Sequence, residues 1–600
     1  MDIQKIIPYL RGASSKGYEI FGAHFVWEQG KSQVRFAVYA PNAQNVAVTG
    51  SFNSWTDWNM ERLDCGVWTL LTPIPQEGDL YKYRITTAQG EVWDRADPFA
   101  FQSELRPSTA SILCRLTDFP WQDGDWLSKR NKNFERPLSI YEVHAGSWRI
   151  KNGEKNEQRF FRYDELAKEL IPYVKRMGYS HIELLPLTEY PLDASWGYQV
   201  SGYFSSTSRY GTPKQLMELI NQCHRENIGV ILDFVPAHFV RDFYALHLFD
   251  GSCLYEHDDP NHRYSPWDTA LFDFTKPHVN SFLRSSLDFW ISVYHFDGIR
   301  YDAVANLIYH NGKKEDGLNE EGIWFLKSTN YALQQDHPQV MLIAEDSSDH
   351  LKVTAPAVYG GLGFDYKWDL GWMHDTLNFF ATPFGERHTM PNFLLFSMSY
   401  FYNENYILAF SHDEVVHGKK TIIDKLWGTY EEKFAQLKCL YLYMTFHPGK
   451  KLSFMGNELA EFREWDEEKE PGWNLLDYPA HLDFFHFLQK LNHIYLKYPA
   501  LWEKDHDSRY FRWLYMGPDV FSIERKNAEG QTLLMVINLS DHDCPFIDLQ
   551  CDGRARLISL LDTQGQEHPD LLSVPFGDSW KFTLPVKALT GTVFLKEDCR

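Results

Sequence analysis

The sequence lacks three features that would place it among nucleic-acid-binding, membrane or exported proteins. No apolar run reaches 18 residues, the N-terminal stretch has no apolar core followed by a small-residue cleavage site, and positive charge is in deficit. With 59 Lys and Arg against 81 Asp and Glu, the formal charge is -22, so a phosphate backbone or an anionic membrane would be repelled. We therefore expect no nucleic-acid partner and no membrane insertion.

Cysteine is also scarce and shows no pairing pattern. The 8 Cys residues are scattered over 600 positions without a C-x-x-C motif. Such usage is typical of a reduced, cytosolic chain, so we expect a cytoplasmic protein. Aromatic residues, by contrast, are abundant at 16% and include 20 Trp. Most should lie in the core, but exposed aromatic faces suit sugar rings, which favours a carbohydrate ligand.

The patterns at both ends of the chain predict antiparallel β-sandwiches. Residues about 18–116 hold short alternating segments such as "VRFAVYA" and "YKYRITT", separated by turn residues, and residues about 500–600 repeat this pattern with "DVFSIERK" and "TLLMVINLS". The predicted domains are an N-terminal β-sandwich over 1–117, a linker over 118–137 and a C-terminal β-sandwich over 499–600.

Between these ends, residues 138–498 alternate short apolar strands with helical patterns. Eight strand–helix units in about 350 residues predict an α/β fold of the (β/α)8 TIM-barrel type, although a doubly wound open sheet fits the pattern alone. Residues about 240–275 exceed a normal connection and predict a loop excursion over the barrel mouth. The predicted strands are 139–147, 181–187, 229–235, 298–304, 341–346, 364–369, 406–413 and 451–458.

Charged residues gather at the carboxyl ends of these strands, where a barrel assembles its active site. Six of the eight predicted strands carry one, which argues against a set of solvated turns, although any single residue is ambiguous. They are His144, Asp233, Arg300 with Asp302, Glu345, His412 with Asp413, and Glu458.

Two of these carboxyl groups have contrasting surroundings. Residues two apart in a strand share a face, so Arg300 and Asp302 in "GIRYD" should project together, and the guanidinium should lower the pKa of Asp302. Glu345 follows the apolar run "VMLIA", where desolvation would raise its pKa. A carboxylate nucleophile and a protonated donor are what retaining glycosidic cleavage requires. The alternative is an ion pair at Asp302 and a helix cap at Glu345.

Two histidines are predicted at the same barrel rim. His238 lies five residues after Asp233, on the loop above the strand, and His412 precedes Asp413. A lone His is more often structural, but two at one rim are better explained as donors to sugar hydroxyls. In "HDEVVH" the histidines stand five apart after a strand, unlike the helical H-E-x-x-H pattern, so a zinc site is not predicted.

Several segments together resemble a known family. "DFVPAH", "DGIRYDAV", "LIAED" and "FSHDEVVHGK" are similar, in this order, to the four signature regions of the α-amylase superfamily (glycoside hydrolase family 13). "YEVHAGSW", "GGLGFDYKWDLGWMHDTL" and "HPGKKLSFMGNELAEFREW" narrow the likeness to the 1,4-α-glucan branching enzymes of glycogen synthesis. The resemblance runs from about residue 20 to the end.

The resemblance implies roles for the site residues. Asp302 would be the nucleophile, Glu345 the general acid/base and Asp413 the carboxylate that holds the sugar and stabilises the transition state. The remaining polar positions would bind substrate, with Tyr198 stacking under the sugar at the cleavage point; they are Asp233, His238, Arg300 and His412. No metal or organic cofactor is needed for this chemistry.

The N-terminal module is similar to the glycogen-binding sandwich of this family, of the carbohydrate-binding module 48 type. Trp55, Lys82 and Trp93 stand at its sugar-contact positions. The resemblance implies donor and acceptor α-1,4-glucan or glycogen as partners, and we expect a monomer or weak oligomer. Two rivals stay open: a debranching or trehalose-releasing hydrolase of the same superfamily, and a non-catalytic glycan-binding scaffold.

Overall fold

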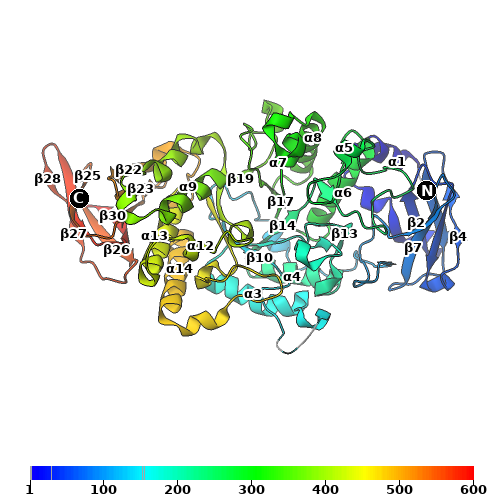
Figure 1. Cartoon of the computed structure of the whole chain (residues 1–600), viewed down its shortest axis with the longest axis horizontal. Coiled ribbons are helices and arrows are strands. Elements are labelled where there is room, and N and C mark those ends of the chain that lie inside the picture. The colour runs from blue at the N-terminus through cyan, green and yellow to red at the C-terminus, as the bar shows by residue number, and fades with distance from the viewer. Residues whose placement is uncertain (1–2, 29, 152, 154–155, 600) are drawn as a thin grey trace. The chain divides into compact units, whose positions relative to one another are not determined.

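The computed structural model describes residues 3–28, 30–151, 153 and 156–599, so residues 1–2 and 29 of the predicted N-terminal sandwich, 152 and 154–155 of the predicted barrel, and 600 lie outside the described residues. Contacts divide the chain into two compact units. The first holds Met1–Asn131, His144–Ile171 and Glu183–Asp365, and the second holds Lys132–Val143, Pro172–Ile182 and Tyr366–Arg600. Figure 1 colours the chain by residue number and labels its elements.

Eight strands form a closed parallel barrel, which confirms the predicted fold class and excludes the open sheet. All eight observed strands end one to four residues earlier than predicted, so Asp302, Glu345 and His412 lie just past the strands rather than within them. The barrel order is β10 (Ser139–Val143), β11 (His181–Leu184), β14 (Gly229–Phe234), β17 (Gly298–Tyr301), β18 (Met341–Ala344), β19 (Tyr366–Trp368), β20 (Tyr406–Phe410) and β21 (Lys450–Phe454).

Helices follow these strands. In α4, Pro213 occupies the first turn and Thr212 forms a capping box with Gln215, which satisfies backbone donors at the helix start. Every residue of β14 is buried, as expected for a parallel strand covered on both faces. The longer helices are α3 (Tyr163–Met177), α4 (Pro213–Arg225), α6 (Pro277–Ser292), α8 (Glu320–Asp336), α9 (Leu370–Ala381), α13 (Tyr430–Phe446) and α14 (Pro479–Lys497).

Two antiparallel sheets make up the N-terminal region, in the orders β1-β2-β6-β5 and β4-β3-β7-β8. Alternation along β7 buries Tyr81, Tyr83 and Ile85. Both tyrosine hydroxyls donate to Asp97, whose pKa burial raises to about 6. The strands are β1 (Gly22–Glu28), β2 (Lys31–Tyr39), β3 (Asn45–Gly50), β4 (Trp58–Asn59), β5 (Glu61–Arg62), β6 (Val67–Thr72), β7 (Leu80–Thr86) and β8 (Val92–Arg95).

The predicted excursion after β14 contacts the N-terminal region. It begins and ends in a two-stranded pair of β15 (His238–Phe239) with β16 (Ala270–Leu271), and it contains α5 (Pro260–Arg263). Nη2 of Arg95 donates to the carbonyl of Leu248 over 2.7 Å, and the main-chain N of Ala96 donates to the carbonyl of Tyr244 over 2.8 Å. The excursion therefore joins the barrel to the N-terminal β domain.

The C-terminal region folds into sheets ordered β22-β23-β24-β30-β26-β27 and β25-β29-β28, with an apolar core between them. Helix α13 contacts β24 and β30, and α13 and α14 pack side by side (Figure 1). None of the helices described is long and apolar enough to cross a membrane. The strands are β22 (Phe511–Met516), β23 (Val520–Lys526), β24 (Thr532–Asn538), β25 (Cys544–Cys551), β26 (Ala555–Asp562), β27 (Leu571–Leu572), β28 (Val574–Phe576), β29 (Ser579–Val586) and β30 (Thr590–Asp598).

Candidate active site

A buried ion pair on two neighbouring strands forms the base of the candidate site. β14 and β17 align so that Asp233 stands opposite Arg300, and neither side chain is exposed. Nη1 of Arg300 donates to the two carboxylate oxygens of Asp233 over 2.7 and 2.8 Å. Burial alone would lower the pKa of Arg300, but its neighbours, Asp233 foremost, raise that pKa well above its ordinary value. Arg300 therefore stays positively charged.

The same guanidinium reaches the two carboxyl groups predicted to be catalytic. Nη1 donates to Oδ1 of Asp302 over 2.9 Å, which confirms the contact expected from strand spacing. Nη2 lies 3.7 Å from Oε2 of Glu345, an oxygen that also accepts a 2.7 Å hydrogen bond from the main-chain N of Ala303. Each carboxylate side chain keeps 17% of its surface exposed. Both groups are thus held by one cation and remain open to a ligand.

The expected pKa difference between Asp302 and Glu345 stays a prediction. The structure adds a cause that the sequence reasoning left out, because Arg300 lies near Glu345 as well as Asp302. A nearby cation favours the ionised form of a carboxyl group and so opposes the effect of desolvation on Glu345.

Tyr198 and His238 stand in the same unit as this cluster. The Tyr198 hydroxyl donates to Oδ2 of Asp233 over 2.5 Å, and it lies 3.5 Å from Nη1 of Arg300. His238 is buried, and burial lowers its pKa to about 4, so the ring is neutral near pH 7. Its Nδ1 has no hydrogen-bond partner among the residues described, and its ring lies 5.3 Å from that of Trp267. A buried ring nitrogen of this kind suits a ligand hydroxyl.

In the second unit, Glu142 on β10 orients His412. The ring Nδ1–H donates to Oε1 of Glu142 over 2.6 Å, and the main-chain N of His412 donates to Oε2 over 2.9 Å. Nε2 lies 3.5 Å from Oδ1 of Asp413, whose side chain is 51% exposed. Glu142 therefore fixes the ring with Nε2 on the side of Asp413.

The segment after Asp413 is tied down by charged side chains. Nζ of Lys419 donates to the main-chain carbonyl of Asp413 over 2.8 Å and lies 3.5 Å from Oε1 of the buried Glu414. The carboxylate of Glu464 accepts hydrogen bonds from the main-chain N of Gly418 and Lys420 over 2.9 and 2.6 Å. Lys419 and Glu464 thus hold the loop that carries Asp413.

The three predicted sugar contacts of the N-terminal domain do not share one face. Trp55 follows β3 and is 42% exposed. On β7, Ile85 is buried and pairs with Trp93, so Trp93 projects from the face opposite to that of Lys82. The Trp93 ring packs against Phe243 of the excursion at 5.4 Å. Trp93 therefore takes part in the contact between the N-terminal domain and the excursion.

Sequence reasoning missed three residues that shape the site. Glu142 lies two residues before His144, so a charged residue inside a barrel strand was an available signal. Trp267 is 49% exposed beside His238, and it stands within the excursion segment that was already singled out. Trp465 lies 6.3 Å from the His412 ring, and it ends the segment "HPGKKLSFMGNELAEFREW" on which the family resemblance already rested.

No group of three or more His, Cys, Asp or Glu side chains in the described part of the chain could hold a metal ion. The Cys residues are all free thiols.

Family models match two parts of the chain. "Carbohydrate-binding module 48 (Isoamylase N-terminal domain)" matches residues 20–100, and "Alpha amylase, catalytic domain" matches residues 167–270. Among solved structures, type I pullulanase from Bacillus subtilis superposes with a TM-score of 0.74 at 17% identity, over 96% of this chain and 85% of that one. A putative α-amylase from Salmonella typhimurium gives 0.70 at 18%, over 96% and 99%. These findings define the class: an amylase-type barrel with flanking β domains.

Curated relatives narrow the class. The 1,4-alpha-glucan branching enzyme GlgB of Bacillus caldolyticus is 47% identical, over 88% of this chain and 80% of its own length. The enzyme of that name from Desulfitobacterium hafniense is 42% identical, over 97% and 95%, and that from Bacillus subtilis is 44% identical, over 88% and 85%. The chain belongs to the family of 1,4-α-glucan branching enzymes.

Proposed function

We propose that the chain cleaves an α-1,4 bond in a glucan and transfers the severed chain to a 6-hydroxyl of an acceptor glucan, which creates an α-1,6 branch. The observation that carries this proposal is the contact of Arg300 with both Asp302 and Glu345. The guanidinium holds two partly exposed carboxyl groups at one place, as a double displacement at a sugar carbon requires.

In the first step, a carboxylate oxygen of Asp302 attacks the anomeric carbon. The bond from that carbon to the glycosidic oxygen breaks, and Glu345 gives its proton to the departing oxygen. In the second step, Glu345 removes a proton from the acceptor 6-hydroxyl, whose oxygen attacks the anomeric carbon and releases Asp302. Two inversions retain the α configuration.

The remaining residues bind and position the sugar. Asp413 stabilises the oxocarbenium-like transition state, and its loop is fixed by Lys419. His238 and His412 present ring nitrogens to sugar hydroxyls. His238 is neutral near pH 7 because burial lowers its pKa to about 4, so it binds a neutral ligand without a desolvated charge.

The proposed partners are donor and acceptor α-1,4-glucan, with the protein acting in the cytoplasm as a monomer or weak oligomer. A hydrolase would release reducing ends without new branches, and the curated relatives do not favour that reading. A non-catalytic scaffold is disfavoured because Asp302, Glu345 and Asp413 are all present.

An assay on amylose tests the proposal. We expect iodine staining to fall without a matching rise in reducing ends, and isoamylase digestion to release the transferred chains. A rise in reducing ends with no isoamylase-sensitive bonds would overturn the branching activity. Replacement of the nucleophile, Asp302→Ala, should abolish transfer and leave glycogen binding nearly intact, and retained turnover would remove Asp302 from that role.

A further inference from the structure

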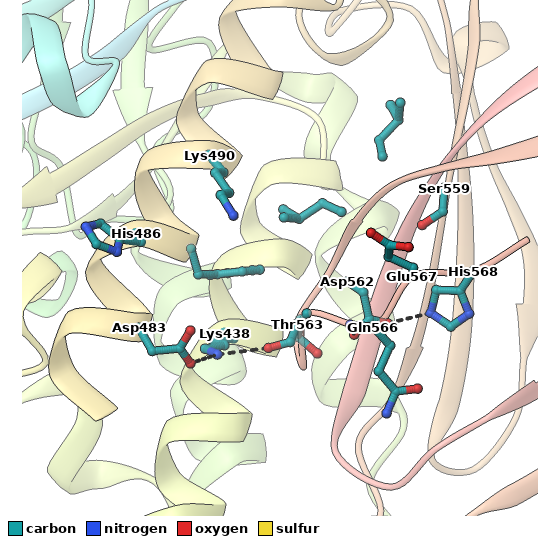
Figure 2. A pocket seen from close by; sticks show the side chains of 14 residues that line it. Lys438, Asp483, His486, Lys490, Ser559, Asp562, Thr563, Gln566, Glu567 and His568 are labelled. Carbon is teal, nitrogen blue, oxygen red and sulfur yellow. Dashed lines mark hydrogen bonds and ion pairs between the residues drawn. The ribbon is translucent and has the colours of Figure 1, made fainter. Parts of the chain in front are cut away.

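Helix α13 carries the C-terminal β domain, and two of its polar side chains, Lys438 and Gln436, take part in the contact. Nζ of Lys438 pairs with Asp483 on α14 and donates to the main-chain carbonyl of Thr563 over 2.9 Å (Figure 2). Thr563 lies just after β26, so this side chain joins two barrel helices to the β domain. The C-terminal β domain is therefore docked on α13 at a defined place.

Arg387, the last residue of α10 (Phe384–Arg387), connects the same β domain to Gln436. The Arg387 side chain is buried, and burial lowers its pKa to about 10, so the guanidinium is charged near pH 7. Nη1 donates to the main-chain carbonyl of Leu539, just after β24, over 2.9 Å, and Nη2 donates to Oε1 of Gln436. One end of the Gln436 amide is thus fixed by a group that also holds the β domain.

The other end of the Gln436 amide holds the segment that follows Asp413. Nε2 donates to the main-chain carbonyl of Trp427 over 2.6 Å, and the main-chain N of Trp427 donates to the carbonyl of Phe380 on α9 over 3.0 Å. Gln436 is fully buried, so leaving either end of its amide without a partner would be costly. Both sides of the Trp427 peptide are therefore fixed to barrel helices.

Helix α12 (Ile422–Lys425) carries this attachment back to the neighbour of Asp413. Nζ of Lys425 donates to the main-chain carbonyl of Glu414, and Nζ of Lys433 on α13 donates to the main-chain carbonyl of Asp424 over 2.7 Å. A continuous series of hydrogen bonds and helix backbone thus runs from the C-terminal β domain through α13 and α12 to the residue beside Asp413.

We propose that Gln436 is a positioning residue for Asp413, which it fixes through α12 against a frame that includes the C-terminal β domain. The proposal rests on the proposed function, in which Asp413 stabilises the transition state. A charge aimed at the transition state loses much of its effect when it is displaced by a fraction of an ångström. A role for Gln436 in stability alone would change Tm and leave kcat as it is.

The test variant is Gln436→Glu, which keeps the acceptor for Arg387 and loses the donor for the Trp427 carbonyl. The guanidinium keeps the introduced carboxylate ionised, so no proton is left to bridge to that carbonyl. We expect Tm to stay near the parental value while kcat on amylose falls at least ~fivefold at unchanged KM, because no group that binds the glucan is altered.

The matched control is Gln489→Glu on α14. Gln489 also donates from Nε2 to a main-chain carbonyl, that of Arg176 over 2.9 Å, but this carbonyl lies outside the segment from Asp413 to Trp427. The same chemical change at this position should leave kcat and KM parental.

A second variant, Lys425→Met, tests the route by cutting the link between α12 and Glu414. It should lower kcat by itself. We expect the double variant Gln436→Glu, Lys425→Met to match the kcat of Lys425→Met within about twofold, because the first change then has nothing left to transmit.

Parental kcat in Gln436→Glu would overturn the proposal, as would losses of kcat that multiply in the double variant. Should Gln436→Glu fail to fold, Lys425→Met decides: a lowered kcat at parental Tm supports the route to Asp413, and a parental kcat overturns it. Failure of the proposed function would be seen separately, as a parent chain that forms no isoamylase-sensitive branches.

Discussion

At the residue scale, Arg300 is the side chain on which the geometry of the candidate site depends, because it contacts Asp233, Asp302 and Glu345 together. Lysine keeps the charge but has no planar fork, so it cannot serve three carboxylates at once. We expect Arg300→Lys to lower kcat on amylose by about 10²–10³, the usual effect of losing a preorganised charge contact. The matched control is Arg525→Lys. Arg525 forms a buried ion pair with Asp505, so this change should reduce thermal stability while kcat stays near parental. Parental kcat in Arg300→Lys would contradict this role.

The contact between Arg300 and Asp302 could be predicted because strand periodicity fixes which residues share a face. The contact of Arg300 with Asp233 depends on the register of two strands far apart in the sequence, which no local pattern gives. The same holds for Glu142 and His412, which stand 270 positions apart and meet only in the folded unit.

At the element scale, the loop after β20 owes its shape to Glu464, whose carboxylate accepts from two backbone N–H groups of the segment that follows Asp413. These bonds hold its pKa below the ordinary value, with Gly418 the largest cause. We expect Glu464→Ala to loosen the loop and lower kcat ~tenfold, about 1.4 kcal/mol in barrier height, with little change in Tm. Glu468→Ala, at an exposed position nearby, is the control and should match the parent. Equal kcat values in the two variants would show that the loop does not position Asp413.

The eight barrel strands were predictable because each is a short apolar run between helical patterns, and β14 is buried throughout. The alternation alone did not decide between a closed barrel and an open sheet, which share it; the count of eight strand–helix units favoured the barrel. The contact of Trp93 with Phe243 was also hidden, because it joins the N-terminal β domain to an irregular excursion.

At the scale of the whole molecule, the segment that links the N-terminal β domain to the barrel is held in the first unit by a buried network around His224. Nδ1 of His224 lies 2.9 Å from Asp123 in the linker, and Nε2 lies 2.9 Å from Asp297, the residue just before β17. Burial alone would lower the pKa of His224, but Asp297 and Asp123 outweigh it and raise the pKa to about 9.

This network predicts a pH-dependent stability. Because the pKa of His224 is higher in the folded than in the unfolded chain, its contribution is fully present below pH ~6.5 and is lost as the pH rises through about 9. We expect His224→Gln to destabilise the chain at pH 6 by about 3 kcal/mol more than at pH 10. Thermal unfolding at both pH values measures the difference, with the exposed His388→Gln as control. A Tm deficit of His224→Gln that is equal at pH 6 and pH 10 would mean that His224 is neutral in the folded protein, since only the charged ring gains from both carboxylates.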